Sequence, residues 1–216
     1  MRKPVIKKKE LIARLKKRFN VGEPIFTEDI MKAWSEYSRT RVFQLLKEFC
    51  NDGSITKYST GIYYFQKTAF WGAPLSLNPE DIAKKKYISN NGETIGYYSG
   101  LTLLNWIGLL NQVPNTPEIV TVNEKTRVRD VMIGKRRFVV RRAKIRITKK
   151  NAPVLQLLEI FNRYDKKLAR YQIENLLALI DNKNIDPKIL KECAKCFPKR
   201  ALENLKRSEI GYVASQ

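Results

Sequence analysis

Apolar residues between positions 24 and 66 follow two helical periods and then a strand period, and this order constrains the fold more than any other feature of the chain. Thr27 has the chemistry of a helix cap and predicts a helix over Thr27–Trp34. After a three-residue turn, a second capped helix is predicted over Ser38–Cys50. Its buried face follows the i, i+3, i+4, i+7 spacing and consists of Val42, Leu45, Leu46 and Phe49.

The segment after this helix predicts a β-hairpin. Asn51-Asp52-Gly53 ends the helix, and Ile55–Tyr58 and Ile62–Phe65 have the apolar and aromatic residues of two paired strands. Gly61 permits the positive φ that a tight turn between them needs. Two helices joined by a short turn and followed by a hairpin are typical of a winged helix-turn-helix. In that motif the second helix enters the major groove of DNA.

The outward side of the second predicted helix carries groups that can contact base edges and phosphates. Six residues are the candidate DNA contacts there: Ser38, Arg39, Thr40, Arg41, Gln44 and Lys47. In the hairpin, the predicted wing, four residues suit phosphate or minor-groove contact: Lys57, Tyr58, Ser59 and Thr60. The sequence leaves an alternative open, in which these polar faces are simply solvated or contact another protein.

The charge of the chain indicates the same class of ligand. The 216 residues include 42 Lys and Arg against 21 Asp and Glu, a net charge of +21, and such a surface favours polyanions such as nucleic acid. Residues 125–150 hold twelve of the basic residues and one acid, Asp130. We expect a second DNA-facing surface there, formed by Arg127, Arg129, Lys135, Arg136, Arg137, Arg141, Arg142, Lys144 and Arg146. A solvated sheet face, or contact with an acidic partner, is the alternative for this segment.

Composition excludes several classes of protein. The chain has no histidine, which excludes His-based acid–base catalysis, Ser-His or Cys-His nucleophile pairs and His metal ligands. Cys193-x-x-Cys196 lacks the further ligands of a structural zinc site, so we expect core packing there, with no metal and no cofactor. No signal peptide and no apolar run of roughly 20 residues is visible, and the sequence predicts a cytoplasmic protein without a membrane partner.

Beyond the winged helix, residues 1–66, the sequence predicts a connector, residues 67–78, and a C-terminal domain, residues 79–216. Further helices are expected over residues 7–19, over Pro79–Tyr87 and over Gly96–Ile107. In a strand-rich segment, residues 118–150, strands are expected at Glu118–Val122, Val128–Ile133, Phe138–Arg142 and Lys144–Thr148. The end, residues 151–206, is predicted to be helical, with one stripe through Val154 and Phe161, a second through Ile173 and Ile180, and helices opening at Asp186-Pro187 and Pro198. The predicted fold class is α+β: an N-terminal winged helix and a mixed domain ending in helices.

Two stretches, Ser38–Phe65 and Ile95–Pro114, together resemble the AbiE-type antitoxin family of transcriptional regulators. The motifs that carry the resemblance include Gly96 to Gly100, Gly108-Leu109 and Gln112-Val113-Pro114, and later segments are similar as well. The resemblance implies that the winged helix binds inverted repeats in the promoter of its own operon and represses it. It also implies that the C-terminal domain acts as an antitoxin against a nucleotidyltransferase-like toxin encoded nearby, without a stable complex. No residue of this chain is matched to that antitoxin action.

The predicted function is therefore that of a double-stranded-DNA-binding repressor and antitoxin of a type IV toxin–antitoxin system, with a dimer or two copies on an inverted repeat. It is not predicted to be an enzyme. A winged-helix regulator without antitoxin activity and an RNA-binding protein are alternatives. A DNA nuclease is a third, and its metal-binding acids would have to come from Glu118, Glu124 and Asp130, which lie on or beside the predicted strands.

Overall fold

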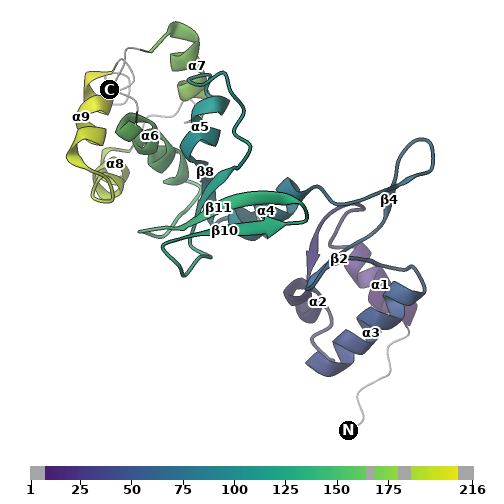
Figure 1. Cartoon of the computed structure of the whole chain (residues 1–216). Coiled ribbons are helices and arrows are strands. Elements are labelled where there is room, and N and C mark those ends of the chain that lie inside the picture. Colours follow the sequence, from purple (N-terminus) through teal and green to yellow (C-terminus); the bar gives the residue numbers. More distant parts are fainter. Residues whose placement is uncertain (1–7, 164–167, 180–185, 209–216) are drawn as a thin grey trace. The chain divides into compact units, whose positions relative to one another are not determined.

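The computed structural model describes residues 8–163, 168–179 and 186–208 (Figure 1). The chain is a mixed α+β protein, as predicted. It divides into two compact units, Met1–Ile82 and Ala83–Gln216. The division falls shortly after the predicted connector, residues 67–78. Each unit is described by itself below.

The first unit contains the helices and the hairpin that the sequence predicts. Its elements are α1 (Lys8–Lys16), β1 (Ile25–Phe26), α2 (Thr27–Ala33), α3 (Arg39–Asn51), β2 (Thr56–Ser59) and β3 (Ile62–Tyr64). The strands form an antiparallel sheet in the order β1-β3-β2. The sequence did not predict β1, because a two-residue strand is too short to show an alternating pattern. It precedes α2 directly and ties the start of that helix to the hairpin.

The predicted caps differ in their outcome. Ser38 caps α3, because its Oγ accepts a hydrogen bond from the Arg41 N–H at 3.3 Å. The prediction that Thr27 caps α2 is wrong, since Thr27 is already the first helical residue. Asp29 stabilises that helix start instead, and its Oδ2 accepts a hydrogen bond from the Phe26 N–H at 3.2 Å.

The core of the first unit is centred on the buried side of α3. The predicted inward face is confirmed: Val42, Leu45, Leu46 and Phe49 are all buried in one cluster. Trp34 is fully buried beside Phe49, with ring centroids 5.7 Å apart, and its Nε1 donates a hydrogen bond to the Leu11 carbonyl at 3.1 Å. This packing leaves one side of α3 for solvent.

A small hairpin follows the three-stranded sheet. It consists of β4 (Lys67–Thr68) and β5 (Pro74–Leu75), which pair antiparallel. Phe70 and Trp71 lie at its tip and are both exposed, Trp71 to 79%. The segment predicted as a connector is therefore in part a regular element.

The second unit is built on a four-stranded sheet and a group of helices. Its strands are β6 (Ser89–Asn90), β7 (Glu93–Thr94), β8 (Gly96–Ser99), β9 (Glu118–Thr121), β10 (Val128–Ile133) and β11 (Arg136–Arg142). Its helices are α5 (Gly100–Trp106), α6 (Ala152–Arg163), α7 (Arg170–Leu179), α8 (Pro187–Ala194) and α9 (Lys199–Arg207), while α4 (Pro79–Tyr87) spans the division between the units. The sheet has the order β10-β11-β9-β8, in which β9 and β11 run parallel and the other pairs antiparallel.

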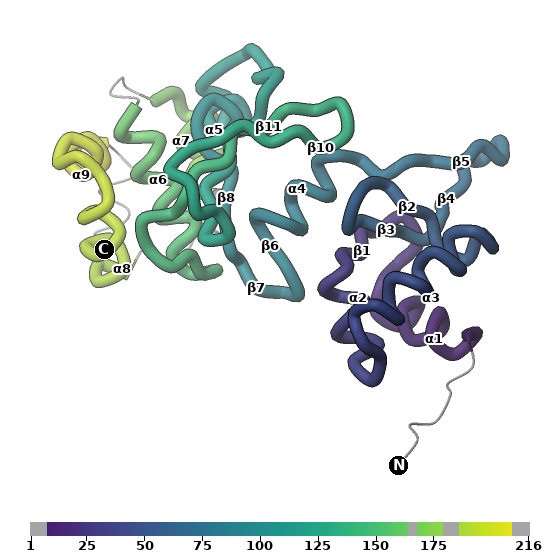
Figure 2. The backbone as a smooth tube through the Cα atoms, turned by 60° about the horizontal axis from the view of Figure 1, so that its bottom comes forward, coloured from purple at the N-terminus to yellow at the C-terminus, as the bar shows by residue number. Residues whose placement is uncertain are grey.

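Helix α6 is the centre of this unit. It is buried along most of its length and packs against β8, α5, α8 and α9 (Figure 2). Its predicted apolar stripe, Val154 to Phe161, lies in the core cluster. In the stripe predicted for α7, Leu176 is buried and Ile173 packs against the same cluster, whereas Ile180 lies outside the described residues. Cys193 of α8 is also buried there, as expected for a packing residue, whereas Cys196 is only partly buried and lies outside the core cluster.

Two predicted elements of the second unit are wrong. Gly96–Ser99 is a strand and not the start of a helix, which begins only at Gly100. Lys144–Thr148 is irregular and not a strand, since β11 ends at Arg142. Lys144 and Arg146 therefore do not continue a strand face from β11, although Ile147 of the same segment is buried.

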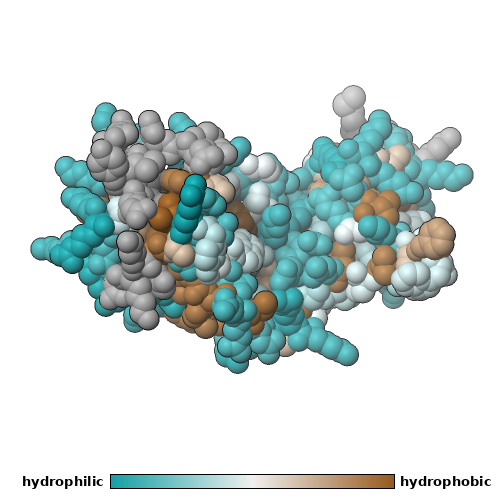
Figure 3. Space-filling view, turned by 90° about the horizontal axis from the view of Figure 1, so that it is seen from above, coloured by the Kyte–Doolittle hydropathy of each residue, from teal (hydrophilic) through white to brown (hydrophobic). Residues whose placement is uncertain are grey.

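The visible face of each unit is mostly hydrophilic and is interrupted by apolar patches, of which the larger lies on the second unit (Figure 3). Among the described residues, no helix combines the length and the apolar composition needed to cross a membrane.

Candidate nucleic-acid interface

Helix α3 presents a mainly polar side to solvent. All six residues predicted as contacts on this helix are exposed: Ser38, Arg39, Thr40, Arg41, Gln44 and Lys47. They are brought together because the four apolar residues of the opposite side are held in the core. The structure thus places this predicted set on one helix face, with the N-terminal turn of α3 carrying four of its members.

Phe43 also lies on the exposed side of α3, and it was not among the residues predicted as DNA contacts. Phe43 is 41% exposed, and the guanidinium carbon of Arg39 lies 5.8 Å from the centroid of its ring. Such a contact holds a cation over an aromatic face without neutralising its charge. The sequence did contain an indication of this exposure. Phe43 directly follows Val42 and therefore lies outside the buried apolar stripe of α3.

Arg41 is held by neighbours on its own helix. Its Nη1 donates to Gln44 Oε1 at 3.1 Å and lies 3.4 Å from Glu48 Oε1. Glu48 in turn lies 2.7 Å from the Lys8 Nζ of α1, and the hydrogen bond from Lys8 lowers the pKa of the Glu48 carboxyl. The three exposed cations of the α3 face, Arg39, Arg41 and Lys47, therefore outweigh the single acid beside them.

The β2–β3 hairpin supplies the four residues predicted as the wing. Lys57, Ser59 and Thr60 are exposed and Tyr58 is half-buried. The register shifts between Lys57 and Ser59, which marks a bulge at Tyr58. The turn is tied to α2, because the Thr27 N–H donates to the Gly61 carbonyl at 3.0 Å. This hydrogen bond fixes the tip of the hairpin relative to the helices of the first unit.

The nine residues predicted as a second basic surface do not share one face. In the β10–β11 register, Arg129 is paired with Val140 and Met132 with Arg137. Strand alternation then places Arg129, Arg136 and Arg142 on the side of the buried Phe138 and Val140. Arg137 and Arg141 lie on the opposite side. Arg127, Lys135, Lys144 and Arg146 are exposed and lie outside the two strands.

Three of these nine cations are neutralised within the protein. Arg129 Nε lies 2.6 Å from Glu124 Oε2, Arg137 Nη2 lies 2.6 Å from Asp130 Oδ2, and Arg141 Nη2 lies 3.0 Å from Glu159 Oε1. Arg142 and Lys144 donate to the backbone carbonyls of Lys125 and Cys196. An ion-paired guanidinium has less charge to offer a phosphate, so this segment is a weaker polyanion surface than its sequence suggests.

The acids considered for a nuclease are each engaged by an arginine. Glu124 and Asp130 form the pairs given above, and Glu118 Oε2 lies 3.7 Å from Arg163 Nη2. Glu124 also accepts the backbone N–H groups of Lys125 and Thr126. Within residues 8–163, 168–179 and 186–208, no three Asp, Glu or Cys side chains come together as metal ligands would.

Comparison of the sequence with protein families and with curated proteins identified no relative. The chain matches no protein-family model, and no curated protein is significantly similar to it in sequence.

Proposed function

We propose that the first unit is a winged helix that binds double-stranded DNA, with α3 as the recognition helix. The observation that supports it most is the division of α3 into a buried apolar side and an exposed side carrying Arg39, Thr40, Arg41, Gln44 and Lys47. Arginine and glutamine can form bidentate hydrogen bonds with base edges in the major groove, and lysine can contact phosphates. The order of elements in this unit, α1-β1-α2-α3-β2-β3, is the order found in winged-helix domains.

The hairpin contributes phosphate or minor-groove contacts through Lys57, Ser59 and Thr60. Because its turn is hydrogen-bonded to the start of α2, the hairpin and α3 meet DNA as one rigid surface, and less ordering entropy is lost on binding. The net charge of +21 attracts the polyanion at long range.

The regulatory role that we infer is repression of the chain's own operon through inverted repeats in its promoter. A symmetric DNA site calls for two copies of the protein, one on each half-site. The antitoxin part of the proposal rests on the resemblance to the AbiE-type family alone. In it, the second unit counteracts a nucleotidyltransferase-like toxin encoded nearby, without a stable complex.

Arg41→Ala tests the α3 assignment. If Arg41 reads a base, the variant loses about 1–3 kcal/mol of operator binding and its specificity relaxes at one base pair. Fluorescence anisotropy on operator and random duplexes measures both effects. Lys17→Ala, which removes an exposed cation outside α3, is the matched control and keeps operator affinity to within twofold. Equal loss on both duplexes makes Arg41 a phosphate contact, and no loss on either removes it from the interface.

Co-expression with the neighbouring reading frame tests the antitoxin role. We expect the full chain to restore growth when a toxic nucleotidyltransferase-like neighbour is expressed. A double variant, Arg39→Ala with Gln44→Ala, should restore growth equally, since the proposed antitoxin action resides in the second unit. Failure of the wild-type chain to restore growth contradicts this role and leaves a regulator without antitoxin activity.

A further inference from the structure

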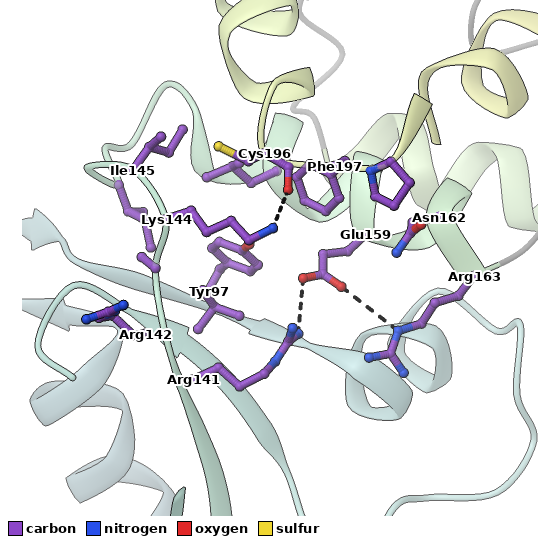
Figure 4. Close-up of a pocket in the computed structure, with 15 residues that line it drawn as sticks. Tyr97, Arg141, Arg142, Lys144, Ile145, Glu159, Asn162, Arg163, Cys196 and Phe197 are labelled. Atoms are coloured by element: carbon purple, nitrogen blue, oxygen red, sulfur yellow. Dashed lines mark hydrogen bonds and ion pairs between the residues drawn. The ribbon is translucent and has the colours of Figure 1, made fainter. Parts of the chain in front are cut away.

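A cavity of about 160 Å³ lies in the second unit, outside the α3 face (Figure 4). It is lined by the end of β11, the irregular segment after it, α6 and the residues just before α9. Arg141, Lys144 and Arg163 contribute its cationic wall with Glu159 among them, and the rings of Tyr97 and Phe197 contribute to its apolar wall. A volume of this size exceeds that of one water several times over, since a water occupies about 30 Å³ in the liquid.

Positive charge predominates in this cavity. Three cations face the cavity, Arg141, Lys144 and Arg163, against one acid, the buried Glu159 (Figure 4). The guanidinium of Arg142, on the opposite side of β11, donates to the Lys125 carbonyl instead. Arg141 and Arg163 both point toward Glu159 (Figure 4), with nitrogen–oxygen distances of 3.0 and 3.9 Å. Arg163 also lies 3.7 Å from Glu118. When both acids are counted against the three cations, the cavity still carries an excess of one positive charge.

Three features indicate that the positively charged groups around the cavity are incompletely satisfied. The Nε of Arg141 is buried and has no hydrogen-bond partner in the described part of the chain. A buried donor of this kind costs free energy, which a nearby anion offsets. Lys144 Nζ donates to the Cys196 carbonyl at 2.7 Å, which leaves its other two N–H groups available. Helix α9 begins just after Pro198, another lining residue, and has no side-chain cap, so its positive end lies at the rim.

We propose that this cavity binds the phosphate group of a small phosphomonoester. The guanidinium groups match the geometry of phosphate oxygens and Lys144 adds a point charge. The excess of positive charge favours an anion, and the rings of Tyr97 and Phe197 accommodate a short, partly apolar body attached to it. The site is a ligand site of the second unit, distinct from the proposed DNA surface of α3.

Isothermal titration of the full chain with inorganic phosphate, at constant ionic strength set with chloride, tests this site. We expect saturable binding of one phosphate per chain. Lys144→Gln and Arg163→Gln each remove one charge-assisted contact and should weaken binding at least about tenfold. Both side chains are partly or largely exposed, so both variants are expected to fold, which circular dichroism verifies. Arg141 is left unchanged because it also hydrogen-bonds Ser99 and Glu159 in the interior.

Arg137→Gln is the matched control, since it removes the same charge from β11 outside the cavity and should leave phosphate affinity unchanged. Absence of saturable binding, or equal weakening by Arg137→Gln, overturns the proposal. A second arm uses a random DNA duplex to distinguish a free phosphate from a backbone phosphate. We expect Lys144→Gln and Arg137→Gln to bind the duplex alike. A different result would assign the cavity to DNA and contradict a small ligand. In that case Lys144→Gln and Arg163→Gln lose affinity for the duplex, Arg137→Gln does not, and free phosphate does not bind.

Discussion

At the scale of single residues, ion pairs in the basic segment of the second unit leave fewer unpaired cations than its sequence suggests. Twelve cations in residues 125–150 suggest an open polyanion surface, yet three of the predicted arginines form pairs with Glu124, Asp130 and Glu159. Two of these acids lie outside the segment, so the local count could not reveal them. The exposed residues of α3, by contrast, were predictable, because the apolar stripe opposite them determines which way they face.

Glu124→Gln tests the ion pair that neutralises the charge of Arg129. The carboxylate is buried, 2.6 Å from Arg129, and accepts two backbone N–H groups. We expect the variant to lose about 1–3 kcal/mol of the free energy of unfolding at pH 7, measured by urea denaturation, because a charge-assisted bond becomes a neutral one. Equal stability of the two proteins contradicts the pairing. Asp130→Asn, in an exposed pair, is the control and should cost less than about 1 kcal/mol.

The same pair predicts a pH dependence. Burial alone would raise the pKa of Glu124, but hydrogen bonds from the Thr126 N–H and from Arg129 outweigh it and lower that pKa below 4.5. The stabilisation is therefore fully present above pH 4.5 and is lost as the pH falls through the folded-state pKa. The difference in unfolding free energy between wild type and Glu124→Gln should shrink in that acidic range. A difference that grows on acidification contradicts the assignment.

Cys193 should be chemically inert in the folded protein. It is buried in the core of the second unit, and burial raises its pKa to about 11. The thiolate is the reactive form of cysteine, so iodoacetamide at pH 8 should label Cys193 only after unfolding. Cys50 and Cys196, which are partly exposed, provide the internal comparison in a peptide mass map. Labelling of Cys193 as fast as Cys196 contradicts its position in the core.

At the scale of elements, the sequence predicted helices well where their apolar stripe was long. Residues 39–51 and 152–163 each carry such a stripe, and both helices begin and end close to where the pattern does. The short elements failed for two different reasons. In β8, Gly96–Ser99, buried aromatic residues fit a helix start as well as a strand, and only pairing with β9 decides between them. At Lys144–Thr148 the alternation is present, but no neighbouring strand pairs with it.

Gly96→Ala tests the close packing of β8. A Cβ at this position would lie 2.0 Å from the Tyr87 carbonyl oxygen and 2.6 Å from that of Val120, and neither backbone atom can move freely. We expect the variant to lose about 3 kcal/mol or more of the free energy of unfolding. Gly92→Ala is the control, with open space around the added carbon and φ +81°, and should cost about 1 kcal/mol. Equal costs for the two variants contradict the predicted steric conflict at Gly96.

At the scale of the whole molecule, the net charge of +21 predicts that the proposed DNA binding depends on salt. If the chain contacts six to ten phosphates, its affinity for duplex DNA should fall by about 10³–10⁵ between 50 and 200 mM salt. Anisotropy titrations at five salt concentrations give the slope of log K against log[salt]. Lys57→Ala should reduce that slope by about one phosphate contact. A slope near zero contradicts electrostatic binding to DNA at any surface of this protein.

In the proposed function, the exposed face of α3 selects a DNA sequence. The most direct measurement selects duplexes that bind the full chain from a random pool, and then compares the affinity of the selected site with that of a random duplex. We expect wild type to prefer the selected site by about 10³-fold or more. The double variant Arg39→Ala with Gln44→Ala should keep binding to random DNA while most of that preference disappears. No enriched sequence, equal preference in the variant, or tighter binding to structured RNA than to duplex DNA contradicts the claim.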